Sequence, residues 1–213
     1  GSTIATDDRI VVTEDKDKKA KIPLWDQRIA SNLVRPLVDT PVTPNQITTV
    51  SLLLSLVGAA LLATGDRSAE NWGAGLFMLG RFLDHFDGQL ARQSGKTSRF
   101  GYVHDYVAGC VSYSALFFAL GFGMRDGLIG SWSIALGALS APIILATTLL
   151  ALRLADEGDD EDYPFFAGFE LEDGIYLIGP IVWLGWIEPF FLLGSVGVIL
   201  FGMWTGYRYL RSR

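Results

Sequence analysis

Residues 84–110 read DHFDGQLARQSGKTSRFGYVHDYVAGC and interrupt a chain that is otherwise rich in long apolar runs. This stretch holds three aspartates and the only two histidines of the chain. Ionisable side chains are costly within a membrane, and where they occur there they usually serve a function. The stretch therefore predicts a functional site on membrane helices.

Helical spacing predicts where these aspartates lie. Residues three, four and seven positions apart share one face of a helix. Asp84 and Asp87 would lie one turn apart on one helix, and Asp105 would lie on the next. Small residues share the faces of the three aspartates: Gly88, Ala91, Gly101 and Gly109. If the two faces meet, three carboxylates converge between two helices.

Converging carboxylates repel one another, and a divalent cation would remove that repulsion. Ligands that are all oxygen suit Mg²⁺, Mn²⁺ or Ca²⁺ better than zinc. The small residues would let a bulky group approach the backbone, and Arg92 could hold a phosphate. This pattern favours a diphosphate bound through metal. Two alternatives stay open: ion pairing with Arg81, Arg92 and Arg99, or a proton or ion pathway.

The rest of the chain predicts an all-α polytopic membrane protein. Half of its 213 residues are hydrophobic, and its mean hydropathy is +0.32. A membrane-spanning helix needs about 20 mainly apolar residues, and polar helix ends can complete the shorter runs. We expect six spans, the last two divided at Glu188-Pro189. The runs are Thr48–Thr64, Trp72–Leu83, Tyr106–Met124, Trp132–Leu152, Ile175–Ile187 and Phe190–Trp204.

The sequence before the first span divides into two parts. Residues 1–21 are polar, and we expect a flexible N-terminus. Residues 22–40 predict an amphipathic juxtamembrane helix in the membrane plane, which Pro36 ends or kinks. Residues 41–213 would form the six-helix catalytic domain. The apolar stripe of the in-plane helix recurs every four residues: Trp25, Ile29, Leu33 and Leu37.

Capping residues predict the helix boundaries around the aspartates. Thr43 and Gln46 form a capping-box pattern, so the first span begins near Pro44. The second span would run from near Glu70 to Arg92 and stop at 94–95, and the third would begin near Gly101. The second and third spans would then form a hairpin that carries the aspartates at its inner end.

Basic residues predict the orientation of the spans. With the N-terminus inside, the loops that face outward carry only Arg67 and Arg125 of the 17 basic residues. This asymmetry favours a cytoplasmic N-terminus and a site that faces the cytoplasm. In a prokaryote, the membrane would be the inner membrane.

The spacing of residues 84–109 resembles the signature of the CDP-alcohol phosphotransferases, D-x2-D-G-x2-A-R-x8-G-x3-D-x3-D. Seven of the eight fixed positions match at the right separation. The segment TPNQIT, at 43–48, also resembles the family where it precedes the first span. The matching positions are Asp84, Asp87, Gly88, Ala91, Arg92, Gly101 and Asp105.

The resemblance implies an enzyme of phospholipid biosynthesis that uses one or two Mg²⁺ or Mn²⁺ ions. A CDP-alcohol, with CDP-diacylglycerol expected, would donate a substituted phosphate group to a small or phosphorylated alcohol, and CMP would leave. The resemblance also implies membrane-lipid partners, no nucleic acid, and a homodimer as an option. It assigns metal binding to Asp84, Asp87 and Asp105, catalysis to Asp105, and substrate binding to Gly88, Ala91, Arg92 and Gly101.

The eighth position of the signature is an aspartate in the family and is Gly109 here. In the family that carboxylate is the proposed general base. His104 is one substitute, and an acidic group of the later loop is another: Glu170, Glu172 or Asp173. An acceptor that supplies its own base is a third route. Two further alternatives are a catalytically impaired CDP-lipid-binding or scaffolding protein, and an ion-coupled transporter.

Overall fold

The computed structural model describes residues 25–156 and 176–211, and these residues form helices without a strand. The all-α prediction is confirmed for this part of the chain. The elements in order are α1 (Trp25–Val34), the 3₁₀ turn η1 (Arg35–Leu37), α2 (Pro44–Leu62), α3 (Arg67–Ser94), α4 (Arg99–Gly123), α5 (Trp132–Asp156), α6 (Ile178–Trp183) and α7 (Ile187–Arg211).

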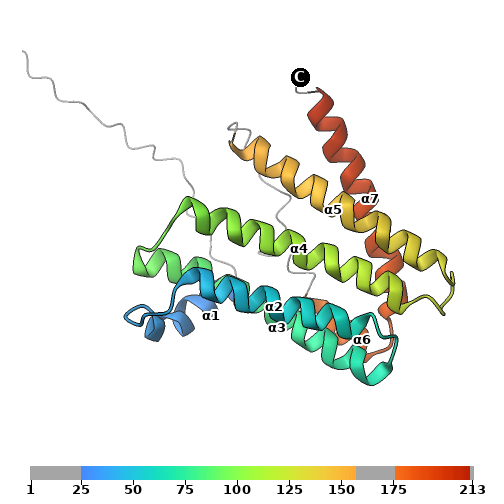
Figure 1. Ribbon diagram of the computed structural model, residues 1–213, viewed down its shortest axis with the longest axis horizontal. Coiled ribbons are helices and arrows are strands. Elements are labelled where there is room, and N and C mark those ends of the chain that lie inside the picture. Colours follow the sequence, from blue (N-terminus) through green and yellow to red (C-terminus); the bar gives the residue numbers. More distant parts are fainter. Residues whose placement is uncertain (1–24, 157–175, 212–213) are drawn as a thin grey trace, which may run out of the picture.

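The helices are arranged around α4. Figure 1 shows α4 between the α2–α3 pair on one side and α5 on the other, with α7 packed against α5. The short helices α1 and α6 both contact α3, near its opposite ends. The longest helix that the structure describes, α3, is therefore covered by α1, α2 and α6.

Four of the described helices are long and apolar enough to cross a membrane, namely Pro44–Leu62, Arg99–Gly123, Trp132–Leu150 and Ile187–Arg211. Helix α3 has 28 residues, which at about 1.5 Å each is ample for a bilayer, although charged residues interrupt its apolar sequence. The chain is an integral membrane protein. The predicted number of six spans is not confirmed.

The predicted fifth span differs from the observed helices. Within the described part of 175–187, α6 has only six residues, which is too short to cross a bilayer. The chain turns at Gly185, whose φ of 85° is left-handed, and not at Glu188-Pro189. Proline is tolerated in the first turn of a helix, so α7 begins at Ile187 and includes Pro189. The Glu188 carboxylate accepts a hydrogen bond from the Leu128 N–H.

Helix α2 packs closely on α3 through small residues. A Cβ added to Gly73 would lie 2.7 Å from the Gly58 carbonyl oxygen, and one added to Gly58 would lie 2.7 Å from the Phe77 nitrogen. A Cβ on Gly80 would similarly lie 2.8 Å from the Ser51 carbonyl oxygen. Close backbone approach at small residues is a usual mode of packing in membrane helices. It brings the buried face of α2 against the face of α3 that carries the aspartates.

Helix α1 packs on α3 with a different face from the stripe that we predicted. Ala30 and Val34 are fully buried and contact Phe86 and Leu90 of α3. Ile29 of the predicted stripe is 42% exposed, and Leu33 is 54% exposed. An exposed apolar pair at this place suits a membrane surface, but the in-plane position stays a prediction. Residues 22–24 of the predicted helix lie outside the described residues.

The predicted caps are observed. The Thr43 N–H donates to Gln46 Oε1 over 2.9 Å, and the Gln46 N–H donates to Thr43 Oγ1 over 3.4 Å. Gly95 ends α3 with a left-handed φ of 68°. Helices α3 and α4 begin slightly earlier than predicted, at Arg67 and Arg99, because Asp66 and Ser98 are their N-caps.

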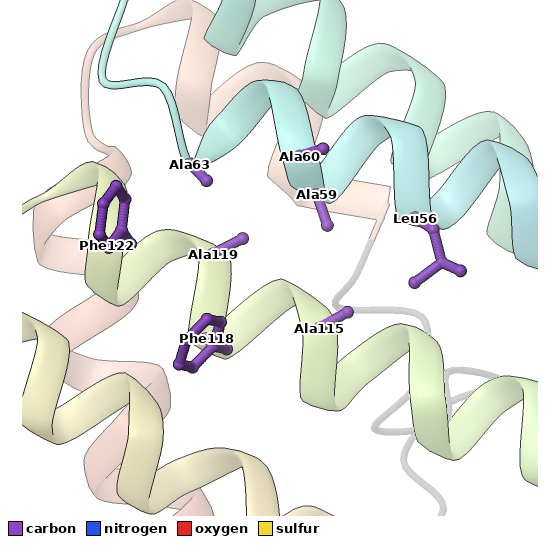
Figure 2. A pocket seen from close by; sticks show the side chains of 8 residues that line it. All are labelled: Leu56, Ala59, Ala60, Ala63, Ala115, Phe118, Ala119 and Phe122. Carbon is purple, nitrogen blue, oxygen red and sulfur yellow. The ribbon is translucent and has the colours of Figure 1, made fainter.

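An apolar groove lies along the C-terminal halves of α2 and α4 (Figure 2). Its volume is about 390 Å³. Small side chains on both helices create the space between them, as Figure 2 shows. The lining residues are Leu56, Ala59, Ala60, Ala63, Ala115, Phe118, Ala119 and Phe122. All of the side chains that line the groove are apolar.

The close contact at Gly73 predicts a stability effect. Gly73→Ala places a methyl group against the α2 backbone, and such overpacking costs about 1–3 kcal/mol. We expect a lower unfolding midpoint in detergent, measured by tryptophan fluorescence. Gly197→Ala is the control, because nothing lies within 4 Å of an added Cβ in α7. A midpoint for Gly73→Ala equal to that of Gly197→Ala would contradict the packing described.

Candidate metal centre

Helices α3 and α4 bring the three predicted aspartates together. One carboxylate oxygen from each of Asp84, Asp87 and Asp105 lies within 4.8 Å of the others. Asp87 is buried, whereas Asp84 and Asp105 are half-buried. Magnesium binds oxygen at about 2.0–2.1 Å and calcium at about 2.3–2.6 Å, so two oxygens on one ion lie at most about 4–5 Å apart, twice the metal–oxygen distance. The residues present therefore fit a divalent cation.

Helix α2 supplies two buried hydroxyl groups to these carboxylates. Thr48 Oγ1 donates to Asp87 Oδ2, and Ser51 Oγ donates to Asp84 Oδ1 over 3.2 Å. Thr48 and Ser51 are three residues apart, as are Asp84 and Asp87. Because α2 and α3 are antiparallel neighbours, the two pairs meet in reverse order along the chain. Groups that hydrogen-bond to metal-ligating carboxylates fix their orientation. Neither hydroxyl was predicted from the sequence to contact the aspartates.

A signal for this second layer of residues was present in the sequence. Thr48, Ser51, Ser55 and Gly58 recur three or four positions apart within an otherwise apolar helix, and all four are buried. Small polar residues on one face of a membrane helix mark the face that contacts another helix. Their periodicity indicates a face of α2, although it does not indicate which helix that face contacts.

Arg81 adds a positive charge to the cluster. Its Nη2 donates to Asp84 Oδ2 over 2.8 Å, and both side chains are largely buried. The guanidinium carbon lies 4.9 Å from the ring centroid of Tyr113. The ion-pair interpretation of the aspartates is thus correct for this one pair. Arg81 is therefore a positively charged neighbour of the predicted metal ligands.

The residues predicted to bind substrate lie around the same end of α3 and α4. Arg92 is exposed, and its Nη2 would lie 3.4 Å from a Cβ on Gly88. Ala91 is half-buried. A Cβ on Gly101 would lie 3.1 Å from Asn45 Oδ1, so a glycine there brings the start of α4 close to the start of α2.

The structure places Gly109 against Arg81. A Cβ on Gly109 would lie 3.8 Å from Arg81 Nη2 and 3.9 Å from Nη1. A Cβ at this position would therefore be in ordinary van der Waals contact with the guanidinium. Position 109, which carries a carboxylate in the family signature, thus lies next to the buried side chain of Arg81.

The two histidines are not part of the aspartate cluster found among the described residues. His104 stacks on Phe100 with ring centroids 5.8 Å apart, and its Nδ1 has no hydrogen-bond partner among the described residues. His85 lies beside Tyr176, with ring centroids 6.3 Å apart. The other substitute bases, Glu170, Glu172 and Asp173, lie outside the described residues.

Comparison with known proteins identifies the family. The model of the CDP-alcohol phosphatidyltransferase family matches residues 41–204, which include α2, α3, α4 and the three aspartates. This chain belongs to the CDP-alcohol phosphatidyltransferase family. The resemblance predicted from the signature is therefore confirmed.

The chain is also similar in sequence or fold to individual synthases. The chain is 30% identical over 181 residues to the archaetidylinositol phosphate synthase of Pyrococcus horikoshii, across 80% of this chain and 90% of that protein. Its fold is similar to that of the phosphatidylinositol phosphate synthase of Mycobacterium tuberculosis with CDP-DAG bound. That match has a TM-score of 0.62 at 21% identity and covers 86% of this chain and 91% of the other.

A second structure of the mycobacterial synthase, in complex with manganese and citrate, gives a TM-score of 0.61. The identity is 22%, and the match covers 83% of each chain. At this identity the likeness concerns the fold. This chain thus shares its helical architecture with a protein that has been crystallised with manganese.

The hydroxyl contact predicts an effect on metal affinity. Thr48→Val removes the donor to Asp87 and should weaken Mn²⁺ binding about 10–100-fold, as is typical for groups that support metal ligands. Thr49→Val is the matched control, because Thr49 is exposed and bonds the Asn45 carbonyl. Mn²⁺ binding is followed by electron paramagnetic resonance. Equal affinity in the two variants would exclude a supporting role for Thr48.

Proposed function

We propose that this protein transfers a substituted phosphate group from a CDP-alcohol, CDP-diacylglycerol first, to a second alcohol with release of CMP. The observation that carries the proposal is the convergence of Asp84, Asp87 and Asp105 within 4.8 Å in a chain of this family. The reaction would belong to phospholipid biosynthesis at the membrane, with the site facing the cytoplasm.

The three aspartates would hold Mg²⁺ or Mn²⁺ by their carboxylate oxygens. Such an ion supplies charge neutralisation at the diphosphate and orients the phosphorus for displacement. Manganese in a structure of similar fold supports this choice of cation. Thr48 and Ser51 would keep the Asp87 and Asp84 carboxylates turned toward the ion through the hydrogen bonds described above.

The nucleotide would lie beside the small residues of α3. Gly88 and Ala91 lie close to Asp87 on α3, and Gly101 lies at the start of α4, beside Asn45. Arg92 is exposed beside Gly88, where its guanidinium suits a phosphate oxygen. The apolar groove between α2 and α4 gives the acyl chains of a lipid donor a surface to follow (Figure 2).

The acceptor must be activated without a carboxylate at position 109. His104 adjoins Asp105 and has an imidazole nitrogen without a hydrogen-bond partner in the described residues, so it remains our candidate base. A phosphorylated alcohol is the alternative, because it brings its own basic oxygens. The similar protein of Pyrococcus horikoshii is named for an inositol phosphate product, which makes a phosphorylated inositol the first acceptor to test.

A second candidate function is CDP-lipid binding without turnover. Gly109 favours it, because a general base typically contributes about 10²–10⁴-fold to the rate, and glycine cannot act as one. This candidate predicts saturable binding of CDP-diacylglycerol but no CMP. It also predicts that Gly109→Asp creates CMP release where the parent protein has none.

The transferase proposal predicts a direct assay result. Purified protein in detergent with Mn²⁺ should release CMP from CDP-diacylglycerol when the right alcohol is present, across a panel that includes inositol and inositol phosphates. Asp84→Asn and Asp87→Asn should each lower the rate at least about 100-fold, which corresponds to about 2.7 kcal/mol of lost transition-state stabilisation. CMP formation is measured by liquid chromatography.

Asp39→Asn is the control for charge removal, because Asp39 is an exposed carboxylate outside the cluster, and it should keep the parental rate. CDP-choline in place of the lipid donor tests whether the donor must be a lipid. Loss of activity in the control to the same extent as in the cluster variants would reject the assigned metal ligands. Absence of CMP with every acceptor would reject the transferase function.

A further inference from the structure

The apolar groove between α2 and α4 has an arginine at one end. Arg125 follows α4, and its Nη1 donates to the carbonyl oxygens of Phe122 over 2.9 Å and of Ala63 over 3.5 Å. The guanidinium carbon lies 4.8 Å from the ring centroid of Phe122. Phe122 and Ala63 both line the groove (Figure 2). The guanidinium is therefore bound at the end of the groove by two of the residues that form its walls.

Exposed tryptophans mark this end of the groove as the level of a membrane surface. Helices α3, α5 and α7 begin near the place where α2 and α4 end (Figure 1). Each of the three carries a strongly exposed tryptophan near its first residue, and tryptophan is enriched where a bilayer meets water. Arg125 therefore lies at the depth of lipid headgroups. The tryptophans are Trp72, Trp132 and Trp186, which are 72%, 77% and 65% exposed.

A donor lipid bound at the aspartates would reach only the near end of the groove. Helix α2 begins at Pro44, at the end of the bundle where Thr48 contacts Asp87. The rise from Pro44 to Leu56, the first groove residue of α2, is about 18 Å at about 1.5 Å per residue. A bilayer has a hydrocarbon core of about 30 Å, so a lipid chain spans about 15 Å of it. Most of the groove therefore lies in the leaflet on the side of Arg125.

The groove and Arg125 together match the two parts of a phospholipid. The apolar walls suit an acyl chain, and a guanidinium binds two phosphate oxygens at once through parallel N–H donors. Asp126 Oδ2 lies 3.7 Å from Arg125 Nε, but the Asp126 side chain is 90% exposed, and an exposed pair of this kind contributes little. An apolar groove alone would accept any acyl chain, whereas the guanidinium adds a preference for a lipid that carries a phosphate.

We propose that the groove binds one phospholipid from the leaflet opposite the aspartates, with an acyl chain between α2 and α4 and its phosphate on Arg125. This lipid is a second lipid ligand of the chain, separate from the donor, and takes no part in the transfer reaction. A ligand that binds only the folded chain stabilises it. The lipid would therefore stabilise the contact between α2 and α4, where small side chains leave space.

The proposal is tested by titrating the full chain in detergent with dioleoylphosphatidylglycerol and measuring the bound lipid by native mass spectrometry, without added metal. Dioleoylglycerol, which has the same chains and no phosphate, is titrated in parallel and should bind less. We expect one phospholipid per chain in the parent protein. Arg125→Gln removes the charge and should weaken binding at least about fivefold. Ala115 points from α4 toward α2 (Figure 2), so Ala115→Leu fills the groove and should also weaken binding.

Three control variants should bind the phospholipid as the parent protein does. Arg67→Gln removes the other arginine that we predict to face outward, whose Nη2 donates to the Trp183 carbonyl. Ala146→Leu adds the same bulk as Ala115→Leu, at an exposed position of α5 outside the groove. Asp87→Asn changes the aspartate cluster, which lies at the other end of the bundle.

Equal affinity in Arg125→Gln and Arg67→Gln would overturn the phosphate contact, and equal affinity in Ala115→Leu and Ala146→Leu would overturn the groove as the site. Weaker binding in Asp87→Asn would place the lipid at the aspartates and reject the proposal. If Ala115→Leu does not elute as a single species, Phe118→Ala replaces it, because it removes an exposed wall of the groove and should also weaken binding. The assay does not measure CMP release, so its outcome is independent of the transferase function.

Discussion

Mutual repulsion among three carboxylates is the constraint on which the arrangement of this protein depends. Asp84, Asp87 and Asp105 would separate if nothing offset their charges. The described structure offsets them in two ways, with the hydroxyls of Thr48 and Ser51 and with the guanidinium of Arg81. The hydroxyl groups stabilise two of the carboxylates without changing their charge, and the guanidinium adds one positive charge. The three aspartates still present carboxylate oxygens close enough together to hold a divalent ion.

The same constraint explains why α2 and α3 pack through glycines. Hydroxyl groups of threonine and serine are short, so they reach the aspartates only if the two helix axes are close. The contact at Gly58 and Gly73 sets this distance in the half of the hairpin away from the site. Membrane helices gain little from apolar burial against one another, since lipid is equally apolar. Close packing and interhelical hydrogen bonds therefore stabilise one and the same contact.

The sequence predicted the elements whose signals are local. Two aspartates one turn apart and a third on the next helix predicted the cluster, and the residues Thr43, Gln46 and Gly95 predicted helix ends, because caps depend on neighbouring residues. Contacts between distant segments were not predictable in this way. No residue near Thr48 in the sequence indicates that its side chain contacts Asp87. The exposure of Ile29 likewise depends on how α1 packs against α3. The turn at Gly185 was missed because Glu188-Pro189 is the stronger local signal, although a helix accepts proline in its first turn.

Gly109 and Arg81 are best understood as one feature of the site. An aspartate at 109 would supply a metal ligand and a general base. A general base favours an acceptor whose hydroxyl group must lose a proton. A guanidinium in the same region supplies neither, and instead raises the positive potential next to the proposed metal site. Such a potential attracts an acceptor that carries negative charge and stabilises the ionised form of its groups. Under the proposed function, a guanidinium in place of a carboxylate would suit a phosphorylated alcohol as the acceptor, because the acceptor's own oxygens could take the proton.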